Sequence, residues 1–337
     1  MISSAIKKLV ESNNLSFDES KIVMEEIMTG QASSVQKSAY LTALRMKGET
    51  SDEILGSAMV MREKVCRIKH HQKKLFDNCG TGGDGSGTFN ISTTASFVIA
   101  GCGVPVGKHG NRSVSSQCGS ADLLSELGAN IDLSPEKVGE CIDEVGIGFL
   151  FAPNLHPAMK EVVPVRKELG IRTIFNILGP LTNPAFATHQ MIGIFDGNYT
   201  NRLAEVAMRL GIKSNLIVHN EIGIDEFATT GMNFVSYSNN GLIHDGKINP
   251  EKFGFTPCKI EDLKGGNAKD NASITREILN GRKSPKRDTV ILNAGVALMV
   301  AEEVENIEEG IAKATEAIDS GAAVEILNLF IEFTKRN

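Results

Sequence analysis

The stretch LFDNCGTGGDGSGTFNISTTASFVIA, residues 75–100, decides the fold class, because a short strand, a glycine-rich turn and a helix follow one another in it. Short apolar runs recur downstream at 104–106, 147–151, 191–195 and 215–219, and helical patterns lie between them at 92–100, 121–127, 135–145 and 201–210. Strands that alternate with helices predict an α/β fold with a mostly parallel central sheet flanked by helices. Such a sheet binds ligands beyond the carboxyl ends of its strands.

The residues before this stretch predict a group of helices. Ser16 with Glu19 and Thr50 with Glu53 are capping-box pairs that start helices. We therefore expect a small N-terminal helical domain over residues 1–70, which part of 165–185 joins. A basic connecting segment near 67–74 leads into a larger α/β domain over residues 71–337. That domain is expected to end in helices near 289–304, 307–320 and 322–334.

Composition excludes several classes of partner. The 337 residues carry a net charge of −6, so no general basic field exists to hold nucleic acid or an anionic membrane. The sequence has no signal-peptide core and no apolar run long enough to span a bilayer. Its six cysteines form no CxxC pair and are typical of reduced thiols, so we expect a cytoplasmic protein.

The glycine-rich turn is a candidate anion site. Its glycines allow backbone N–H groups to surround a ligand closely. The string also matches GxGxxG, but a dinucleotide site expects an acidic residue about twenty residues later, and Lys108-His109 stands there instead. A P-loop fails as well, because His109 follows Lys108. The segment Asn90-Ile91-Ser92-Thr93 then opens a helix whose free N–H groups favour an anion, although Asn90 or Ser92 could equally be a helix cap.

A second polar segment follows the next predicted strand. Two cations and several hydroxyl and amide groups fall within nine residues, Lys108-His109-Gly110-Asn111-Arg112-Ser113-Val114-Ser115-Ser116. A solvated loop is the alternative interpretation, but that density after a buried strand favours a second anion site. Ser120 lies at the start of the next helix.

These strings together resemble the anthranilate phosphoribosyltransferase family. GTGGD at 80–84, the N-x-S-T helix start at 90–93 and KHGNR at 108–112 occur in the family's order. The long motif at 166–184, preceded by His156-Pro157, and the GIDE string at 223–226 also match it. The resemblance runs nearly end to end. It implies transfer of the 5-phosphoribosyl group from phosphoribosyl pyrophosphate to the amine of anthranilate in tryptophan biosynthesis, giving N-(5-phosphoribosyl)anthranilate and pyrophosphate.

The resemblance also implies roles for individual residues. Lys108, Arg166 and Asn111 would be catalytic, and magnesium would be held by Ser92, Asp225 and Glu226. Anthranilate would be contacted by Gly80, Asn111 and Arg166, with His109 and His156 along its route. Phosphoribosyl pyrophosphate would be surrounded by Gly80, Gly83, Asp84, Thr88, Asn90, Ile91, Ser92, Thr93, Lys108, His109, Gly110, Asn111, Arg112, Ser113, Val114, Ser115, Ser116 and Ser120. The family further implies a homodimer through the helical domain.

The chemistry of these residue types agrees with the implied reaction. Magnesium prefers oxygen ligands and takes one or two carboxylates, which Asp225 and Glu226 would supply, and a guanidinium grips a carboxylate with two parallel bonds. Alternatives stay open for each residue: a solvated acidic pair, a surface Arg166 on a helix ahead of Gly170, and His156 as a helix cap. No general base is identified. A pyrimidine nucleoside phosphorylase-like enzyme and a non-catalytic nucleic-acid-binding paralogue are the competing functions.

Overall fold

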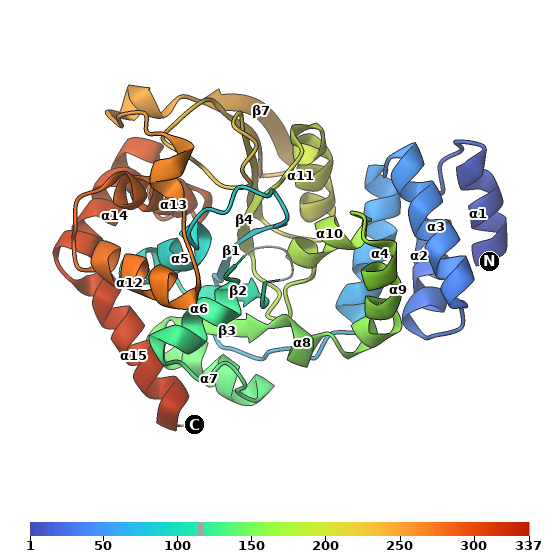
Figure 1. Cartoon of the computed structure of the whole chain (residues 1–337), viewed down its shortest axis with the longest axis horizontal. Helices are drawn as coiled ribbons and strands as arrows, with labels where there is room; N and C mark the ends of the chain where they lie inside the picture. The colour runs from blue at the N-terminus through green and yellow to red at the C-terminus, as the bar shows by residue number, and fades with distance from the viewer. Residues whose placement is uncertain (114–116, 337) are drawn as a thin grey trace.

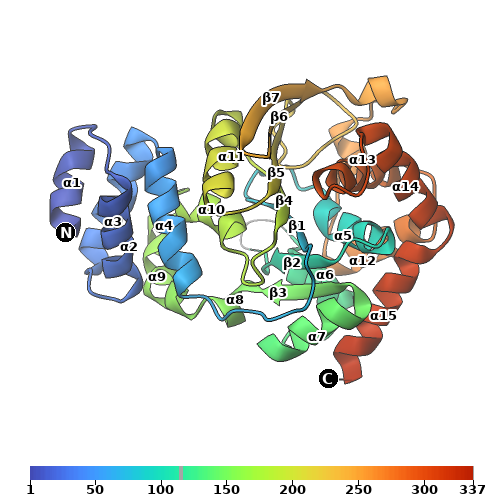
Figure 2. The ribbon, with the colours of Figure 1, turned by 180° about the vertical axis from the view of Figure 1, so that it is seen from behind.

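A seven-stranded sheet forms the centre of the molecule, and a separate group of helices lies at one end of it (Figures 1 and 2). The computed structural model describes residues 1–113 and 117–336, so the expectations for Val114, Ser115 and Ser116 fall outside the described residues. The N-terminus lies on the helical group and the C-terminus on α15 at the opposite end. No helix among the described residues combines the length and apolar character that crossing a membrane requires.

The sheet confirms the expected fold class. Its strand order is β3-β2-β1-β4-β5-β6-β7, and neighbouring strands from β3 to β5 run parallel, whereas β5, β6 and β7 pair antiparallel. The strands are β1 (Phe76–Gly80), β2 (Val106–Gly110), β3 (Ile147–Phe151), β4 (His189–Gly193), β5 (Ser214–Asn220), β6 (Asn233–Asn239) and β7 (Leu242–Ile248).

Both faces of the sheet are covered, and alternate residues of one strand enter different cores. Met191 of β4 packs in the core formed with α5, α13 and α15, whereas its neighbour Ile192 packs in the core shared with α11 and the helical group. The helices on and around the sheet are α5 (Ile91–Gly101), α6 (Ser120–Leu127), α7 (Pro135–Val145), α8 (Ala152–Leu155), α11 (Thr200–Arg209), α12 (Ala268–Leu279), α13 (Pro285–Val300), α14 (Ile307–Asp319) and α15 (Ala322–Arg336).

The helical group begins as the sequence predicts. Ser16 and Thr50 form the expected capping boxes with Glu19 and Glu53, and α3 ends at Gly48. The group comprises α1 (Ile2–Val10), α2 (Phe17–Met28), α3 (Ser34–Lys47) and α4 (Ser51–Glu63), and two later helices, α9 (Val163–Leu169) and α10 (Phe175–Leu178), lie beside it (Figure 1).

Several sequence expectations were wrong in detail. The strand expected at 104–106 lies at Val106–Gly110, so Lys108 and His109 belong to β2 and are buried instead of lying in a loop after it. The hairpin of β6 and β7 and the helix α12 were not expected. The hairpin turns at Asn240 and Gly241, both with positive φ, as a tight two-residue turn requires.

The chain order of the strands creates a switch point beside β1. From β1 the chain moves to β2 and β3 on one side, and it then returns to place β4 on the other side of β1. Loops from the carboxyl ends of β1 and β4 therefore diverge, and a crevice at such a point is where open α/β sheets bind ligands. The glycine-rich turn follows β1 directly, so the fold places it at this crevice.

Candidate active site

Two glycines let a distant loop lie against the ends of β1 and β4. Gly80 and Gly193 pair in register across these strands, and a Cβ atom on either one would collide with Asp225. The Asp225 carboxylate accepts the backbone N–H of Gly82 at 2.6 Å. Glycine at these two positions therefore leaves the space that Asp225 needs to reach the glycine-rich turn.

The acidic pair faces the beginning of α5. Glu226 Oε1 accepts the backbone N–H of Ser92 at 3.1 Å, and Asp225 is 8% exposed. Burial raises the pKa of both carboxyls; the charge of Asp84 raises that of Asp225 further, and the charge of Asp225 raises that of Glu226. Asp225 is therefore not a solvated surface side chain. Carboxylates held this close ionise together most readily when a cation lies beside them.

The residues present fit a divalent ion of the magnesium type. Mg²⁺ is usually held by one or two carboxylates and completes its shell with water and substrate phosphates. Over residues 1–113 and 117–336, no three His, Cys, Asp or Glu side chains gather into a metal-binding cluster. Two carboxylates and the Ser92 hydroxyl therefore suit an ion that arrives with a phosphorylated ligand better than a structural metal.

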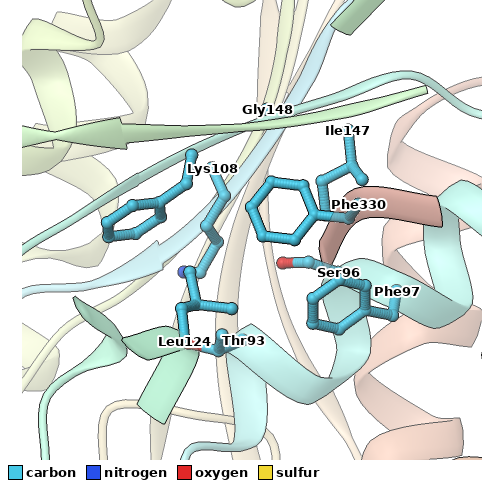
Figure 3. Close-up of a pocket in the computed structure, with 9 residues that line it drawn as sticks. Thr93, Ser96, Phe97, Lys108, Leu124, Ile147, Gly148 and Phe330 are labelled. Carbon is cyan, nitrogen blue, oxygen red and sulfur yellow. The ribbon is translucent and has the colours of Figure 1, made fainter. Parts of the chain in front are cut away.

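Lys108 brings a buried positive charge to the same place. Its side chain extends from β2 toward the first turns of α5, where Thr93 and Ser96 lie (Figure 3). Lys108 is 4% exposed; its Nζ donates to the carbonyl of Asn78 and lies 3.4 Å from Ser92 Oγ. Among the described residues no carboxylate oxygen lies within 4.0 Å of it. Asp77 and Glu226 interact with this buried ammonium only at longer range, and an anionic ligand would supply a direct partner.

Side chains replace ladder hydrogen bonds between β1 and β2. These strands pair in register at Phe76 and Val106, whereas β1 and β4 pair at five positions. Beyond that pair, the His109 N–H donates to Asp77 Oδ1 at 3.2 Å, and Asn183 Nδ2 donates to the Gly107 carbonyl at 2.8 Å. Buried Asp77 therefore holds the strand that carries Lys108 and His109, a role that the sequence analysis did not assign.

His109 and His156 form a buried pair at the ends of β2 and α8. Their Nε2 atoms lie 3.1 Å apart, and their ring centroids are separated by 5.0 Å. Burial lowers the pKa of His156 to about 4 and, with the neighbouring His156 and Lys108, lowers the pKa of His109 well below its usual value. Both rings are therefore neutral near pH 7. His156 does precede a helix, the 3-10 helix Pro157–Glu161, but its side chain makes no capping hydrogen bond, so the capping role of the imidazole is wrong.

The second polar segment is organised by an acidic residue that the sequence analysis did not single out. Asp122 of α6 accepts hydrogen bonds from Arg112 Nη1 at 2.9 Å and from the Ser113 N–H at 3.0 Å. Ser120 Oγ accepts the N–H of Asn111 at 3.2 Å. The Asn111 and Arg112 side chains stay exposed, and contacts with α6 fix the backbone around them.

Arg166 lies on α9, one turn before the helix ends at Gly170. The side chain is half-buried with its Cζ 5.6 Å from the Phe175 ring centroid, and burial lowers its pKa. Its guanidinium has no carboxylate within 4.0 Å in the described part of the chain, and no hydrogen bond there joins it to Gly80 or Asn111. The contacts of this structure thus leave Arg166 outside the group formed by Gly80, Gly82, Asp225, Ser92, Glu226 and Lys108.

Comparison with known proteins agrees with this geometry. Residues 3–65 match the model of a glycosyl transferase family, helical bundle domain, and residues 72–324 match that of a glycosyl transferase family, a/b domain. The chain is 52% identical over 334 residues to the anthranilate phosphoribosyltransferase of Acetivibrio thermocellus, covering 99% of this chain and 97% of that protein. The chain belongs to the anthranilate phosphoribosyltransferase family. This confirms the resemblance found in the sequence.

Solved structures of anthranilate phosphoribosyltransferases share the fold over their whole length. The enzyme from Thermus thermophilus superposes with a TM-score of 0.93 at 42% identity, covering 98% of this chain and 99% of its own. The enzyme from Saccharomyces cerevisiae, in complex with PRPP and Mg, superposes with a TM-score of 0.91 at 28% identity, covering 100% of this chain and 98% of its own.

Proposed function

We propose that this member of the anthranilate phosphoribosyltransferase family transfers the 5-phosphoribosyl group of phosphoribosyl pyrophosphate to the amine of anthranilate, in tryptophan biosynthesis. The observation that carries the proposal is the meeting of the adjacent Asp225 and Glu226 with Ser92 and Lys108 at the switch point of the sheet. Buried acidic groups and a buried cation side by side suit a ligand that brings both phosphates and a divalent ion.

The donor is proposed to bind across the crevice. The N–H groups of the glycine-rich turn and of the first turn of α5 would hold phosphate oxygens, and Lys108 would face the negative charge that develops on departing pyrophosphate. Magnesium on Ser92, Asp225 and Glu226 would supply further neutralisation of that charge when bound. The proposed donor contacts are Gly80, Gly83, Asp84, Thr88, 90–93, 108–116 and Ser120.

The acceptor is proposed to bind between Arg166, Asn111 and the His109–His156 pair. The planar guanidinium of Arg166 matches the carboxylate of anthranilate, because it can donate two parallel hydrogen bonds. No carboxylate of the described residues lies within 4.0 Å of this guanidinium, so it is available to the acceptor. The amine lone pair forms the new bond to C1 of the ribose while the C1–O bond breaks toward pyrophosphate. An aromatic amine is already unprotonated at neutral pH, so its lone pair is free to attack. Bond formation leaves a cationic nitrogen with two protons, one of which can leave to solvent, and neutral His109 and His156 need not act as bases.

Further proposals concern organisation. The helical domain would comprise residues 1–70 with part of 165–185, because Val165 and Phe175 share a hydrophobic core with Leu41 and Leu44. A cytoplasmic location is supported by six free cysteines. A homodimer through the helical domain follows from the family resemblance, and light scattering of the purified protein tests it.

The decisive assay follows the fluorescence of anthranilate. Consumption should require both phosphoribosyl pyrophosphate and magnesium, and a folded sample without activity would contradict the proposal. Two parallel measurements test the competing functions. Phosphorolysis of uridine or thymidine would favour a nucleoside phosphorylase-like enzyme, and a salt-sensitive shift of DNA would favour a nucleic-acid-binding paralogue.

A further inference from the structure

Arg172 joins the segment that carries Arg166 to the glycine-rich turn. Its Nη2 donates to the carbonyl of Gly83, at the middle of the turn, although the two residues lie 89 positions apart in the sequence. Its guanidinium is stacked on Phe195, with Cζ 4.1 Å from the ring centroid. Phe195 lies just after β4, so this arginine rests on the β4 end while it holds the turn that follows β1. A planar guanidinium makes both contacts at once, and a lysine would not.

The two ends of the glycine-rich turn have anchors of their own. At its start, the Thr81 N–H donates to the Gly193 carbonyl at 2.9 Å, and the Gly82 N–H donates to Asp225. At its end, the Gly265 N–H donates to the Gly87 carbonyl at 3.0 Å. These anchors come from the α/β part of the chain. Arg172 differs from them because it comes from the segment between α9 and α10.

Arg172 and Arg166 belong to one short, compact piece of chain. Arg166 is on α9, the helix ends at Gly170, and Thr173 immediately precedes the turn into α10. The Thr173 N–H donates to Asn176 Oδ1 at 3.0 Å, and the Thr173 side chain is buried. The Arg166 side chain lies over Phe175 of α10. A change in the position of Arg172 is therefore transmitted to Arg166 through a few residues that are tied together.

We propose that Arg172 is a positioning residue that couples the two substrate sites. When the donor orders the glycine-rich turn, Arg172 holds the segment that carries Arg166 in place for the acceptor. The inference rests on the proposed function, with the donor at the glycine-rich turn and the acceptor carboxylate at Arg166. A donor phosphate that holds Gly83 in place also holds Arg172 in place. Arg172 in turn holds the segment that carries Arg166. Because binding linkage is reciprocal, each substrate then raises the affinity of the other by the same factor.

The coupling is measured with salicylate, a fluorescent acceptor analogue whose hydroxyl replaces the amine. The protein contains no tryptophan, so the ligand signal is read without interference from indole. The dissociation constant of salicylate is determined with and without phosphoribosyl pyrophosphate plus magnesium, and a pyrophosphate assay verifies that no turnover occurs. For the unmodified protein, the donor should tighten salicylate binding by about 5-fold or more, within the usual range of allosteric coupling.

The test variant is Arg172→Met, and the matched control is Arg202→Met. Arg202 also stacks on an aromatic ring, with Cζ 5.5 Å from the Tyr199 centroid, and also donates to a backbone carbonyl of another segment, that of Glu49 at 3.1 Å. We expect the coupling factor to fall to near 1 in Arg172→Met and to stay unchanged in Arg202→Met. Arg172→Lys, which keeps the charge without the planar fork, should lose most of the coupling and covers the case in which Arg172→Met does not fold.

Three outcomes overturn the inference: no coupling in the unmodified protein, full coupling in Arg172→Met or Arg172→Lys, or equal loss of coupling in the Arg202→Met control. The proposed function is judged separately by anthranilate consumption in the unmodified protein. If that activity is present and Arg172→Met keeps its coupling, the inference alone fails. If the unmodified protein consumes no anthranilate, the proposed function fails.

Discussion

Gly193→Ala is the sharpest perturbation that the structure offers, because it acts on the acidic pair without changing any polar group. A Cβ atom at Gly193 would lie well inside 3.0 Å of the backbone carbonyl of Asp225, closer than real Cβ atoms approach other atoms. The neighbour is backbone and not the end of a flexible side chain, so the Asp225 loop must retreat by at least about 1.5 Å. A misplacement of about 1 Å in a catalytic constellation can lower the rate about 10²-fold.

We therefore expect Gly193→Ala to lower kcat/KM about 10²-fold and to raise the magnesium concentration needed for half-maximal activity. Overpacking should also lower the free energy of unfolding by about 1–3 kcal/mol. Anthranilate fluorescence at varied magnesium measures the first two effects, and a urea titration measures the third. Gly246→Ala is the matched control, since Gly246 also lies in a strand of the sheet but its Cβ would meet Val235 at an ordinary 3.7 Å. Unchanged magnesium dependence in a folded Gly193→Ala protein would refute the reasoning.

Three other predictions follow from single side chains. Lys108→Met should lower turnover about 10²–10³-fold, because it removes one charged donor to the leaving group. If steady-state kinetics show a loss of less than about tenfold, Lys108 does not have that role. Arg166→Ala should raise the KM for anthranilate far more than the KM for phosphoribosyl pyrophosphate; equal increases would mean that Arg166 is misassigned. Since the folded-state pKa of His156 lies at about 4, below its usual 6.5, its contribution to stability is complete above about pH 6.5 and is lost as the pH falls toward 4. Urea titrations should show that the free energy of unfolding is lower at pH 5.0 than at pH 7.5, with His156 contributing about 2 kcal/mol of the difference. His156→Gln should remove this contribution, whereas buried His109 contributes in the same direction and is unaffected by the substitution.

The parts of the fold that the sequence predicts are those whose signals are local. Ser16 and Thr50 begin helices through bonds to residues three positions away, and Ile147–Phe151 is a strand with an uninterrupted apolar run. The hairpin of β6 and β7 also has a local signal that was not used in the prediction, the Asn240-Gly241 turn between two runs of alternating residues. The strand β2 was misplaced for another reason. Gly107 and Lys108 are poor strand formers, and tertiary contacts to Asp77 and Asn183 hold them in the sheet.

The candidate site was predicted in its contiguous parts and not in its long-range contacts. The glycine-rich turn and the start of α5 are adjacent in the sequence, so their joint position could be inferred. Asp225 lies 143 residues from Gly82, and only the strand order brings them together. Arg172 was visible within a motif, but nothing local indicates that it reaches Gly83. Asp77 carried a usable signal, because a carboxylate inside a buried strand requires partners.

The central claim, that the acidic pair and the glycine-rich turn hold a phosphorylated sugar together with a divalent ion, is tested most directly by calorimetric titration of phosphoribosyl pyrophosphate into the protein. With magnesium, the account predicts saturable binding that weakens by at least about tenfold when the ion is chelated or when Asp225→Asn and Glu226→Gln are combined. Binding of equal strength in all three conditions would contradict it.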